Sequence, residues 1–352
     1  MDERDRSASN DANAGVEAFR AVVAIGASAG GVTALRRFVE GLRPDLAAPI
    51  LIVQHIGAYP SILPELLARS GPLPAAHARE GEVLRAGRIY LAPPDHHMFV
   101  EGSALRLSRG PKEHHTRPAI DPLFRSVALT YGPRAIGVLM TGWGEDGTAG
   151  LQAIKACGGR VFVQQPTEAE QRDMPMSALH YVAVDRLVSV DGLADDLAEA
   201  LAAPLDAGAP LVRPDPLVHE HQSFLMQGGP MEHLNAIGRP SPYTCPDCFG
   251  GLWEIDGAKP RRFRCHTGHA YTLRTLQEAQ SGGTDTALWN ALRGLEEKEM
   301  LLREVAGQYL QEGNAVEAAR LEVLAHSVSG NAALLRELLE REDSPAAQSR
   351  TG

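Results

Sequence analysis

The sequence has few cysteines and few aromatic residues, and it holds no long apolar run. Four of its 352 residues are cysteine, and Phe, Trp and Tyr together make up 5%. Four cysteines are too few for a disulfide scaffold at this length. No stretch approaches the roughly 20 apolar residues that a bilayer-spanning helix requires, and the N-terminal residues lack the layout of a secretory signal. We therefore expect a cytoplasmic protein with reduced thiols and no membrane insertion.

The chain also lacks an excess of positive charge. It has 34 Lys and Arg residues and 44 Asp and Glu residues, which gives a formal net charge of −10. A protein that binds a phosphate backbone needs a basic face. We therefore predict that nucleic acid is not a partner. The length of 352 residues exceeds that of one ordinary domain, so we expect at least two folded parts.

Short apolar runs alternate with helix-like stretches between Val22 and Val190. Six runs are typical of strands, and most are apolar along their whole length: AVVAIG, PILIVQH, GRIYLAP, AIGVLMTG, GRVFVQQ and RLVSV. Strands that are apolar on both faces indicate a parallel sheet covered by helices on each side. The pattern predicts an α/β fold with a doubly wound, mostly parallel sheet over residues 19–202.

The rest of the chain divides by composition. Residues 1–18 and 343–352 are polar, and we expect them to be disordered tails. Scattered prolines over residues 203–242 predict a linker. A Cys/His-rich module follows at 243–275. Two strongly helical segments within 284–342 predict an α-helical hairpin.

The stretch VVAIGASAGG places Ser28 in a glycine-rich bend between a predicted strand and a predicted helix. A dinucleotide cradle would read G-x-G-x-x-G with an acid after the next strand, but that strand ends in Gln54 and His55. Gly26, Ser28 and Gly30 also fit the G-x-S-x-G nucleophile elbow. A serine that caps the following helix is the third alternative. The bend alone does not decide between them.

Two further residues strengthen the nucleophile alternative. A serine nucleophile needs a base, and the base needs an orienting carboxylate. His55 ends the second strand-like run, and Asp146 lies in the glycine-rich turn of LMTGWGEDGTAG after another apolar strand. Each has an ordinary structural explanation by itself. Because parallel strands end at one edge of a sheet, their joint occurrence with Ser28 favours a Ser-His-Asp site. The order along the chain differs from that of α/β-hydrolases.

Five blocks within residues 22–190 resemble, in order, the catalytic domain of the chemotaxis receptor protein-glutamate methylesterases: IGASAGG, IVQHI, YLAPPDHHM, RPAIDPLFRSVA and LMTGWGEDGTAGL. The resemblance implies Ser28 as nucleophile, His55 as general base and acid, and Asp146 as orienting carboxylate. It implies the backbone amide of Trp143 as an oxyanion donor. Methylated cytoplasmic helices of bacterial chemoreceptors are the implied partner.

The reaction implied by this resemblance is hydrolysis of glutamate methyl esters, together with deamidation of receptor glutamines, and it needs no cofactor for catalysis. The chain departs from the family pattern at Trp143, where methionine is more frequent, so an aromatic wall is expected beside the nucleophile. Only about 20 polar residues precede the first predicted strand, and we expect no receiver domain there. The alternative is a non-catalytic signalling or adaptor module of the same fold that binds receptors or regulators.

The Cys/His module has metal-ligand spacing. Cys245 and Cys248 form a C-x2-C pair, sixteen residues follow, and Cys265 and His269 complete the set. Two such pairs can converge on one tetrahedral ion, so these four residues are the predicted ligands of a structural zinc, with His266 as the alternative fourth ligand. The module and the helices after it resemble an extension on some family members, which implies contact with other chemosensory signalling proteins.

Several polar residues lie in predicted loops of the α/β part. We expect solvated or substrate-rim roles for them, with metal binding by adjacent histidines as the alternative. They are Asp95, His96, His97, His114, His115 and Arg117.

Overall fold

The computed structural model of the protein describes residues 19–203 and 210–342. The two predicted tails and part of the predicted linker lie outside the described residues, at 1–18, 204–209 and 343–352. The chain forms two compact units, of which the first ends at Thr275 and the second begins at Leu276. The central sheet and the Cys/His module both belong to the first unit.

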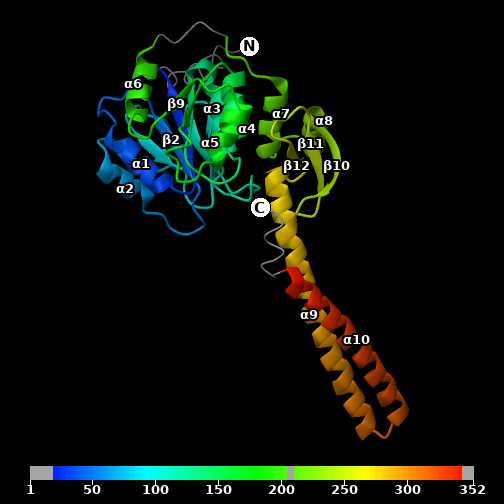
Figure 1. Cartoon of the computed structure of the whole chain (residues 1–352). Helices are drawn as coiled ribbons and strands as arrows, with labels where there is room; N and C mark the ends of the chain where they lie inside the picture. Colours follow the sequence, from blue (N-terminus) through cyan, green and yellow to red (C-terminus); the bar gives the residue numbers. More distant parts are fainter. Residues whose placement is uncertain (1–18, 204–209, 343–352) are drawn as a thin grey trace, which may run out of the picture. The chain divides into compact units, whose positions relative to one another are not determined.

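A seven-stranded sheet forms the centre of the first unit (Figure 1). Its strands run in the order β3-β4-β2-β1-β7-β8-β9, and every neighbouring pair is parallel. They are β1 (Val22–Ala27), β2 (Ile50–Gln54), β3 (Ala75–His77), β4 (Ile89–Leu91), β7 (Ala135–Leu139), β8 (Arg160–Gln164) and β9 (Arg186–Val188). The sheet confirms the predicted fold class. All six predicted strand runs contain one of these strands, and the short β3 is additional.

Helices cover both faces of the sheet (Figure 1). One apolar core lies against α1 (Gly31–Glu40), α2 (Leu63–Ser70) and α6 (Leu193–Ala202). The other lies against α3 (Ile120–Tyr131), α4 (Thr148–Ala156) and α5 (Asp173–Tyr181), and a short 3₁₀ helix, η3 (Gly132–Arg134), follows α3. The side chains of β1 alternate between the two cores, so its apolar run is explained by burial on both faces.

An antiparallel hairpin adds to the core beside α3. It consists of β5 (His97–Glu101) and β6 (Ala104–Ser108). Met98, Val100 and Leu105 are buried in the same core as the apolar face of α3, and the amide of Val100 donates to the hydroxyl of Ser126 over 3.1 Å. This part of the chain is therefore a packed hairpin and not the loop that its histidines suggested.

The described part of residues 203–242 differs from the predicted linker. It contains α7 (Asp215–Phe224) and α8 (Pro230–Ile237), and Phe224 is buried against His97 and Phe99. The linker prediction rested on the prolines. Pro216 and Pro230 lie in the first turns of these helices, where a missing amide hydrogen costs no helical hydrogen bond. The segment is thus part of the first unit.

The Cys/His module forms a four-stranded antiparallel sheet. Its strands are β10 (Gly238–Thr244), β11 (Gly251–Ile255), β12 (Arg262–Cys265) and β13 (Ala270–Thr272), paired in chain order. We refer to residues 238–272 as the ribbon. Phe263 and Tyr271 are fully buried in it. Phe249 is 82% exposed, so it does not fill the core of the ribbon as its apolar character suggested.

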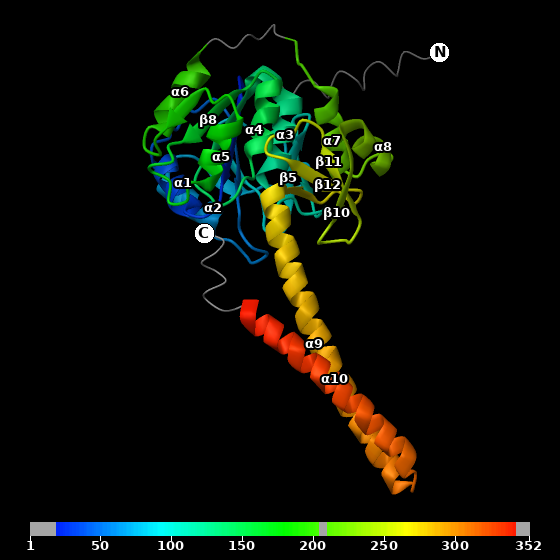
Figure 2. The ribbon, with the colours of Figure 1, turned by 45° about the vertical axis from the view of Figure 1, so that its right-hand side comes forward.

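The second unit consists of two long helices, α9 (Leu273–Gln311), whose first three residues belong to the first unit, and α10 (Ala315–Glu342). Figure 2 shows them side by side as a hairpin, which agrees with the predicted architecture. Leu292, Ala332 and Leu339 are buried between them. The first helix starts earlier than expected and continues through Gly282 and Gly283 without a break. Among the described residues, no helix has the length and apolar character needed to cross a membrane.

Candidate active site

Ser28 directly follows β1, the central strand of the sheet. Its amide donates to the carbonyl of Thr141 over 2.9 Å, and its carbonyl accepts a hydrogen bond of 2.7 Å from the side chain of Gln54. Gly30 has a φ of 79°, a backbone conformation that glycine adopts at little cost, and the chain turns there into α1. Neighbours on both sides thus hold Ser28 at the carboxyl edge of the sheet.

His55 follows β2, the strand beside β1. Its amide donates to the carbonyl of Ala27, its Nδ1 lies 3.1 Å from the Oγ of Ser28, and its Nε2 lies 2.7 Å from Oδ2 of Asp146. A carboxylate accepts hydrogen bonds, so Nε2 carries the proton and Nδ1 is free to accept one from the serine hydroxyl. The side chain of His55 is 14% exposed, which leaves one side of the imidazole open.

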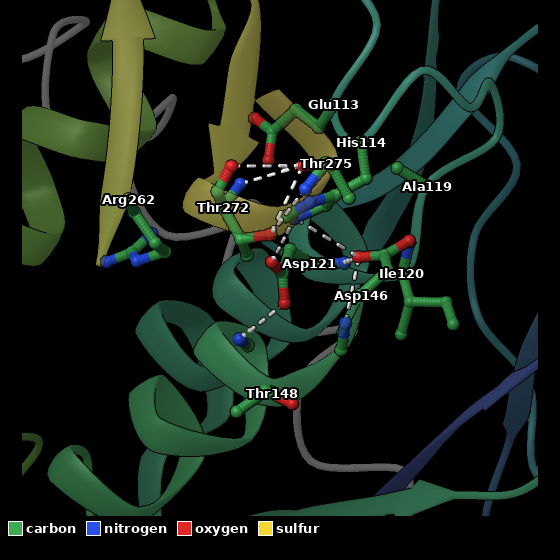
Figure 3. A network of polar contacts seen from close by, with 12 residues as sticks. Glu113, His114, Ala119, Ile120, Asp121, Asp146, Thr148, Arg262, Thr272 and Thr275 are labelled. Carbon is green, nitrogen blue, oxygen red and sulfur yellow. Dashed lines mark hydrogen bonds and ion pairs between the residues drawn. The ribbon is translucent and has the colours of Figure 1, made fainter. Parts of the chain in front are cut away.

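Asp146 lies in the turn between β7 and α4, and its carboxylate is almost fully buried. Its two oxygens accept backbone hydrogen bonds from Ile120 over 2.7 Å, Asp121 over 3.0 Å and Gly147 over 2.8 Å (Figure 3). Ile120 and Asp121 begin α3, whose N-cap residue offers no side-chain cap. Asp146 therefore satisfies the first amides of α3 from a distant part of the chain.

The surroundings of Asp146 favour its charged form. Burial alone would raise the pKa of this carboxyl group, but the hydrogen bond from His55, the nearby charge of His114 and the backbone amides outweigh it and lower the pKa. Burial likewise opposes the charged form of His114, yet its hydrogen bond to Asp121 and the charge of Asp146 raise the pKa of His114 to about 9. A negative charge on Asp146 keeps the proton on Nε2 of His55.

The three predicted site residues thus meet at one edge of the sheet and form a continuous chain of hydrogen bonds. Each follows a parallel strand, and β1 lies between β2 and β7. Such a chain can accept the proton of a serine hydroxyl and can stabilise the imidazolium that results. The arrangement is suited to nucleophilic attack on an acyl group.

The turn after β7 passes close to the serine. A Cβ atom on Gly142 would lie 2.6 Å from the Cβ of Ser28, so only glycine leaves room there. The amides of Thr141 and Gly142 donate to Gln164 and Gln171. For the next amide, that of Trp143, the described part of the chain contains no hydrogen-bond partner, and the indole is 58% exposed.

A depression in the surface opens in front of the serine. Its lining comes from the bend after β1, the start of α1, the end of β2 and the loop before α5. The lining residues are Ser28, Ala29, Gly30, Val32, Thr33, Gln54, His55 and Glu170. A small acyl side chain can therefore reach the serine from solvent.

Sequence reasoning missed three residues that support the site. Gln54 holds the bend, and its place directly before His55 was a usable signal. Asp121 accepts a hydrogen bond from the amide of Gly150 and lies beside Asp146. His114 contacts both carboxylates, at 3.0 Å from Asp121 and 3.9 Å from Asp146. His114 was noted only as a polar loop residue, because no local pattern links it to Asp121 or to Asp146.

The expectation of solvated or rim roles is wrong for two of the loop histidines. His97 is fully buried, with Nδ1 accepting from the amide of Ala119 and Nε2 donating to the carbonyl of Pro111. His114 is 8% exposed. Arg117 also has an internal role, since it donates to Asp95 over 2.6 Å and to two backbone carbonyls.

The four predicted metal ligands lie together in the ribbon. The ligand atoms of Cys245, Cys248, Cys265 and His269 are all within 4.8 Å of one another. The sulfurs of Cys248 and Cys265 are 3.6 Å apart, and the Nδ1 of His269 is 3.5 Å from the sulfur of Cys265. A tetrahedral zinc with bonds of about 2.3 Å places its ligand atoms about 3.7 Å apart, so the donor set and spacing fit zinc. His266 lies outside this group.

Comparisons with known proteins concern the α/β part. The family described as CheB methylesterase matches residues 23–197. Protein-glutamate methylesterase/protein-glutamine glutaminase 2 of Anaeromyxobacter dehalogenans is 42% identical over 179 residues, which cover 51% of this chain and 52% of that protein. A relative from Leptospira interrogans is 36% identical over 179 residues, which cover 50% of this chain and 92% of the relative.

A solved structure, the catalytic domain of the Thermotoga maritima CheB methylesterase, is 29% identical, covers 51% of this chain and 98% of that one, and has a TM-score of 0.49. The chain spans about half the length of the first curated relatives that it matches. The ribbon and the helical hairpin lie outside the matched residues.

Proposed function

The chain belongs to the CheB methylesterase family, and we propose that it hydrolyses glutamate methyl esters in the cytoplasmic helices of bacterial chemoreceptors. The observation that carries the proposal is the hydrogen-bonded chain from Ser28 through His55 to Asp146. The names of the relatives support the ester as one substrate and the glutamine side chain as another. The site of action is then the cytoplasm, where these receptor helices lie.

In the proposed reaction Ser28 is the nucleophile and His55 moves the proton. The hydroxyl oxygen of Ser28 attacks the ester carbonyl while Nδ1 of His55 takes its proton. The tetrahedral intermediate collapses, and the same proton passes to the departing methoxide, which leaves as methanol. Water then attacks the glutamyl ester of Ser28, with Nδ1 as the base, and releases glutamate. For a glutamine substrate the same steps release ammonia.

Asp146 orients the base throughout this cycle. Its Oδ2 holds the proton on Nε2 of His55, so Nδ1 faces the serine in the form that can accept a proton. The ring is reversed relative to the chymotrypsin arrangement, in which Nε2 faces the serine. The chemistry is the same, because either nitrogen can serve as the base when the other is held by a carboxylate.

We propose the backbone amide of Trp143 as a donor to the oxyanion of the intermediate. Support comes from the close approach of the preceding residue, Gly142, to Ser28 and from the partners already taken by the amides of Thr141 and Gly142. A donor fixed before the reaction stabilises negative charge as it develops, and losing one such donor costs about 10²- to 10³-fold in rate.

We propose a structural zinc ion in the ribbon, held by Cys245, Cys248, Cys265 and His269. Four protein ligands leave no position for a reacting water, so the ion would supply folding energy and no chemistry. A ribbon of this size has a small apolar core that contributes little stability, and small domains commonly gain stability from a bound metal. Metal analysis of the purified chain should give about one zinc per chain, and Cys248→Ser should lose it.

The hairpin of α9 and α10 is our proposed contact for other chemosensory signalling proteins. Large apolar side chains remain exposed on it, and surfaces of this kind are frequent at protein interfaces. They are Leu273, Trp289, Met300, Leu301, Val305, Leu310, Val316, Val323, Leu324, Leu334 and Leu338. Val316→Glu combined with Val323→Glu should abolish cross-linking to these proteins and leave ester hydrolysis unchanged.

The decisive experiment for the enzymatic proposal measures methanol release from a receptor fragment that carries glutamate methyl esters. Wild type should release methanol, and Ser28→Ala should be slower by about 10⁴-fold or more in kcat. Ser70→Ala is the matched control, because Ser70 lies at the end of α2 and contacts Arg36. Equal release by wild type and Ser28→Ala would remove Ser28 as the nucleophile.

A further inference from the structure

Residues 113–116 form a tight turn between the ribbon and the orienting carboxylate. Glu113 and Thr116 close it as a backbone bridge, and His114 and His115 within it have φ angles of 52° and 60°. Left-handed backbone is unfavourable for residues with a side chain, and two in succession persist only where the surroundings hold them. The contacts that hold this turn therefore decide where its side chains point.

The backbone of the ribbon pairs with the turn. The amide of His114 donates to the carbonyl of Ala270 over 2.8 Å, and the amide of Ala270 donates to the carbonyl of Lys112 over 3.4 Å. The ring of His115 contacts the carbonyl of Thr275 at 3.3 Å. Strand β13 thus pairs with the turn through Ala270, and the position of the strand sets the position of His114.

A buried ion pair makes a second connection between the ribbon and the turn. The carboxylate of Glu113 accepts hydrogen bonds of 2.8 Å from both Arg264 of β12 and Arg125 of α3. Glu113 and Arg264 are each 1% exposed. Separating them would leave buried charges without partners, so the pair keeps β12 attached to the turn.

On its other side the turn reaches the active site. Nε2 of His114 lies 3.0 Å from Oδ2 of Asp121 and 3.9 Å from Oδ1 of Asp146. Figure 3 shows the three side chains close together. Oδ2 of Asp146 accepts the hydrogen bond from Nε2 of His55. A positive charge on His114 would attract Oδ1 of Asp146 and so act with the three backbone amides that orient Oδ2, the oxygen that holds the base.

The residues that connect the ribbon to the turn are neighbours of the metal ligands. Arg264 directly precedes Cys265, and Ala270 directly follows His269. An ion that draws Cys265 and His269 together also fixes these two neighbours. Binding of a metal here would therefore reach His114 through two short stretches of backbone.

We propose that His114 is a positioning residue for Asp146 and that the metal-loaded ribbon holds it in place, so that loss of the metal slows the reaction at Ser28. The inference rests on the proposed methylesterase activity. His114 touches neither the ester nor the serine, and its effect passes through Asp146 and His55. Of the residues on this path only His55 lines the depression, so substrate binding should depend little on His114.

The first test replaces His114 and separates kcat from KM. His114→Leu should lower kcat for methanol release about 10- to 100-fold with KM unchanged, and His114→Gln, which keeps a donor, should recover part of the loss. His326→Leu is the matched control, since His326 is exposed on α10. Melting curves identify the folded variants. A wild-type kcat in His114→Leu, or an equal loss in the Leu and Gln variants, would refute the positioning role.

The second test removes the metal from wild type. A chelator, or Cys248→Ser, should lower kcat to a similar extent and speed hydrogen exchange of the amides at 113–121, and added zinc should restore the chelated protein. His114→Leu combined with Cys248→Ser should be no slower than the slower single variant, because both act through one path. Unchanged exchange and unchanged kcat after metal removal would contradict the inference.

The two tests also separate this inference from the proposed function. If the metal-loaded wild type releases no methanol, the proposed function fails, and the exchange measurement still decides whether the ribbon holds the turn. If wild type releases methanol but the His114 and metal results are negative, the proposed function stands and the inference alone is wrong.

Discussion

Ser28 and His55 reach solvent at the carboxyl edge of the sheet, whereas an ionic cluster joining α3, α7 and the ribbon is almost entirely buried. Four side chains of the cluster are at most 7% exposed, and they are Glu113, Arg125, Glu220 and Arg264. The fifth, Arg262, is 17% exposed, about as much as His55 at 14%. The proposed catalytic residues are held by single hydrogen bonds and backbone amides. The cluster is held by several guanidinium groups around each carboxylate.

The difference follows from what each group has to do. A catalytic base changes charge in every cycle, so its surroundings must tolerate both forms and leave one side open to the substrate. The cluster must keep its charges. Burial would raise the pKa of Glu220, but the guanidinium groups of Arg262 and Arg125 outweigh it and lower the pKa to about 2. Ionisable residues thus suit proton transfer at the edge of the sheet, and in the interior they hold α3, α7 and the ribbon together.

The comparison predicts that a change at the edge affects rate and leaves stability unchanged. His55→Gln should lower kcat by about 10⁴- to 10⁶-fold, because the serine loses its base. The free energy of unfolding should change by less than about 1 kcal/mol, since Asp146 keeps its backbone donors. Urea unfolding and methanol release measure the two effects. His180→Gln, an exposed residue of α5, is the control. A large loss of stability in His55→Gln would break the comparison.

The interior should show the opposite behaviour. Glu220→Gln removes one carboxylate from among three guanidinium groups, and breaking a buried pair in this way costs about 3 to 5 kcal/mol of stability. The kcat of the folded fraction should stay within a few-fold of wild type. Glu199→Gln is the matched control, because Glu199 pairs with Arg186 on the surface and such pairs contribute about 0 to 1 kcal/mol. Equal destabilisation by both substitutions would contradict the assigned role of the cluster.

The edge could be predicted from the sequence because its signals are local. Ser28, His55 and Asp146 each follow an apolar strand, and the rule that parallel strands end at one edge brings them together without further information. The grouping of the four proposed zinc ligands could also be predicted, since C-x2-C and C-x3-H are short patterns. The structure places His269, the residue preferred from the sequence, with the three cysteines, and the alternative His266 is outside this group.

The interior could not be predicted because its partners are distant in sequence. Glu113 and Arg264 are 151 residues apart, and neither belongs to a recognisable motif. The proline-rich composition around α7 and α8 is the same as that of a linker. Only the burial of Phe224 shows that this segment is folded. His114 looked like a solvated loop residue for the same reason. Its role depends on the fold of the ribbon more than 120 residues later.

The smallest expected effect concerns the buried His97, whose protonation should make the free energy of unfolding depend on pH. Burial lowers the pKa of His97 to about 4, and the neutral ring is satisfied by Ala119 and Pro111. Below pH 6.5 the unfolded chain binds a proton that the folded chain does not, so stability is complete above pH 6.5 and falls as the pH drops toward 4. By pH 4.5 the loss should reach about 2 to 3 kcal/mol.

His97→Gln isolates this contribution, because glutamine keeps one donor and one acceptor and does not titrate. Urea unfolding at pH 7.5 and pH 4.5 should show a smaller acid loss in the variant than in wild type, by about 2 kcal/mol. His221 is also buried with a lowered pKa, but it is present in both proteins and cancels in the difference. Identical acid losses would mean that His97 is protonated in the folded protein, and the interior would then tolerate a change of charge as the edge does.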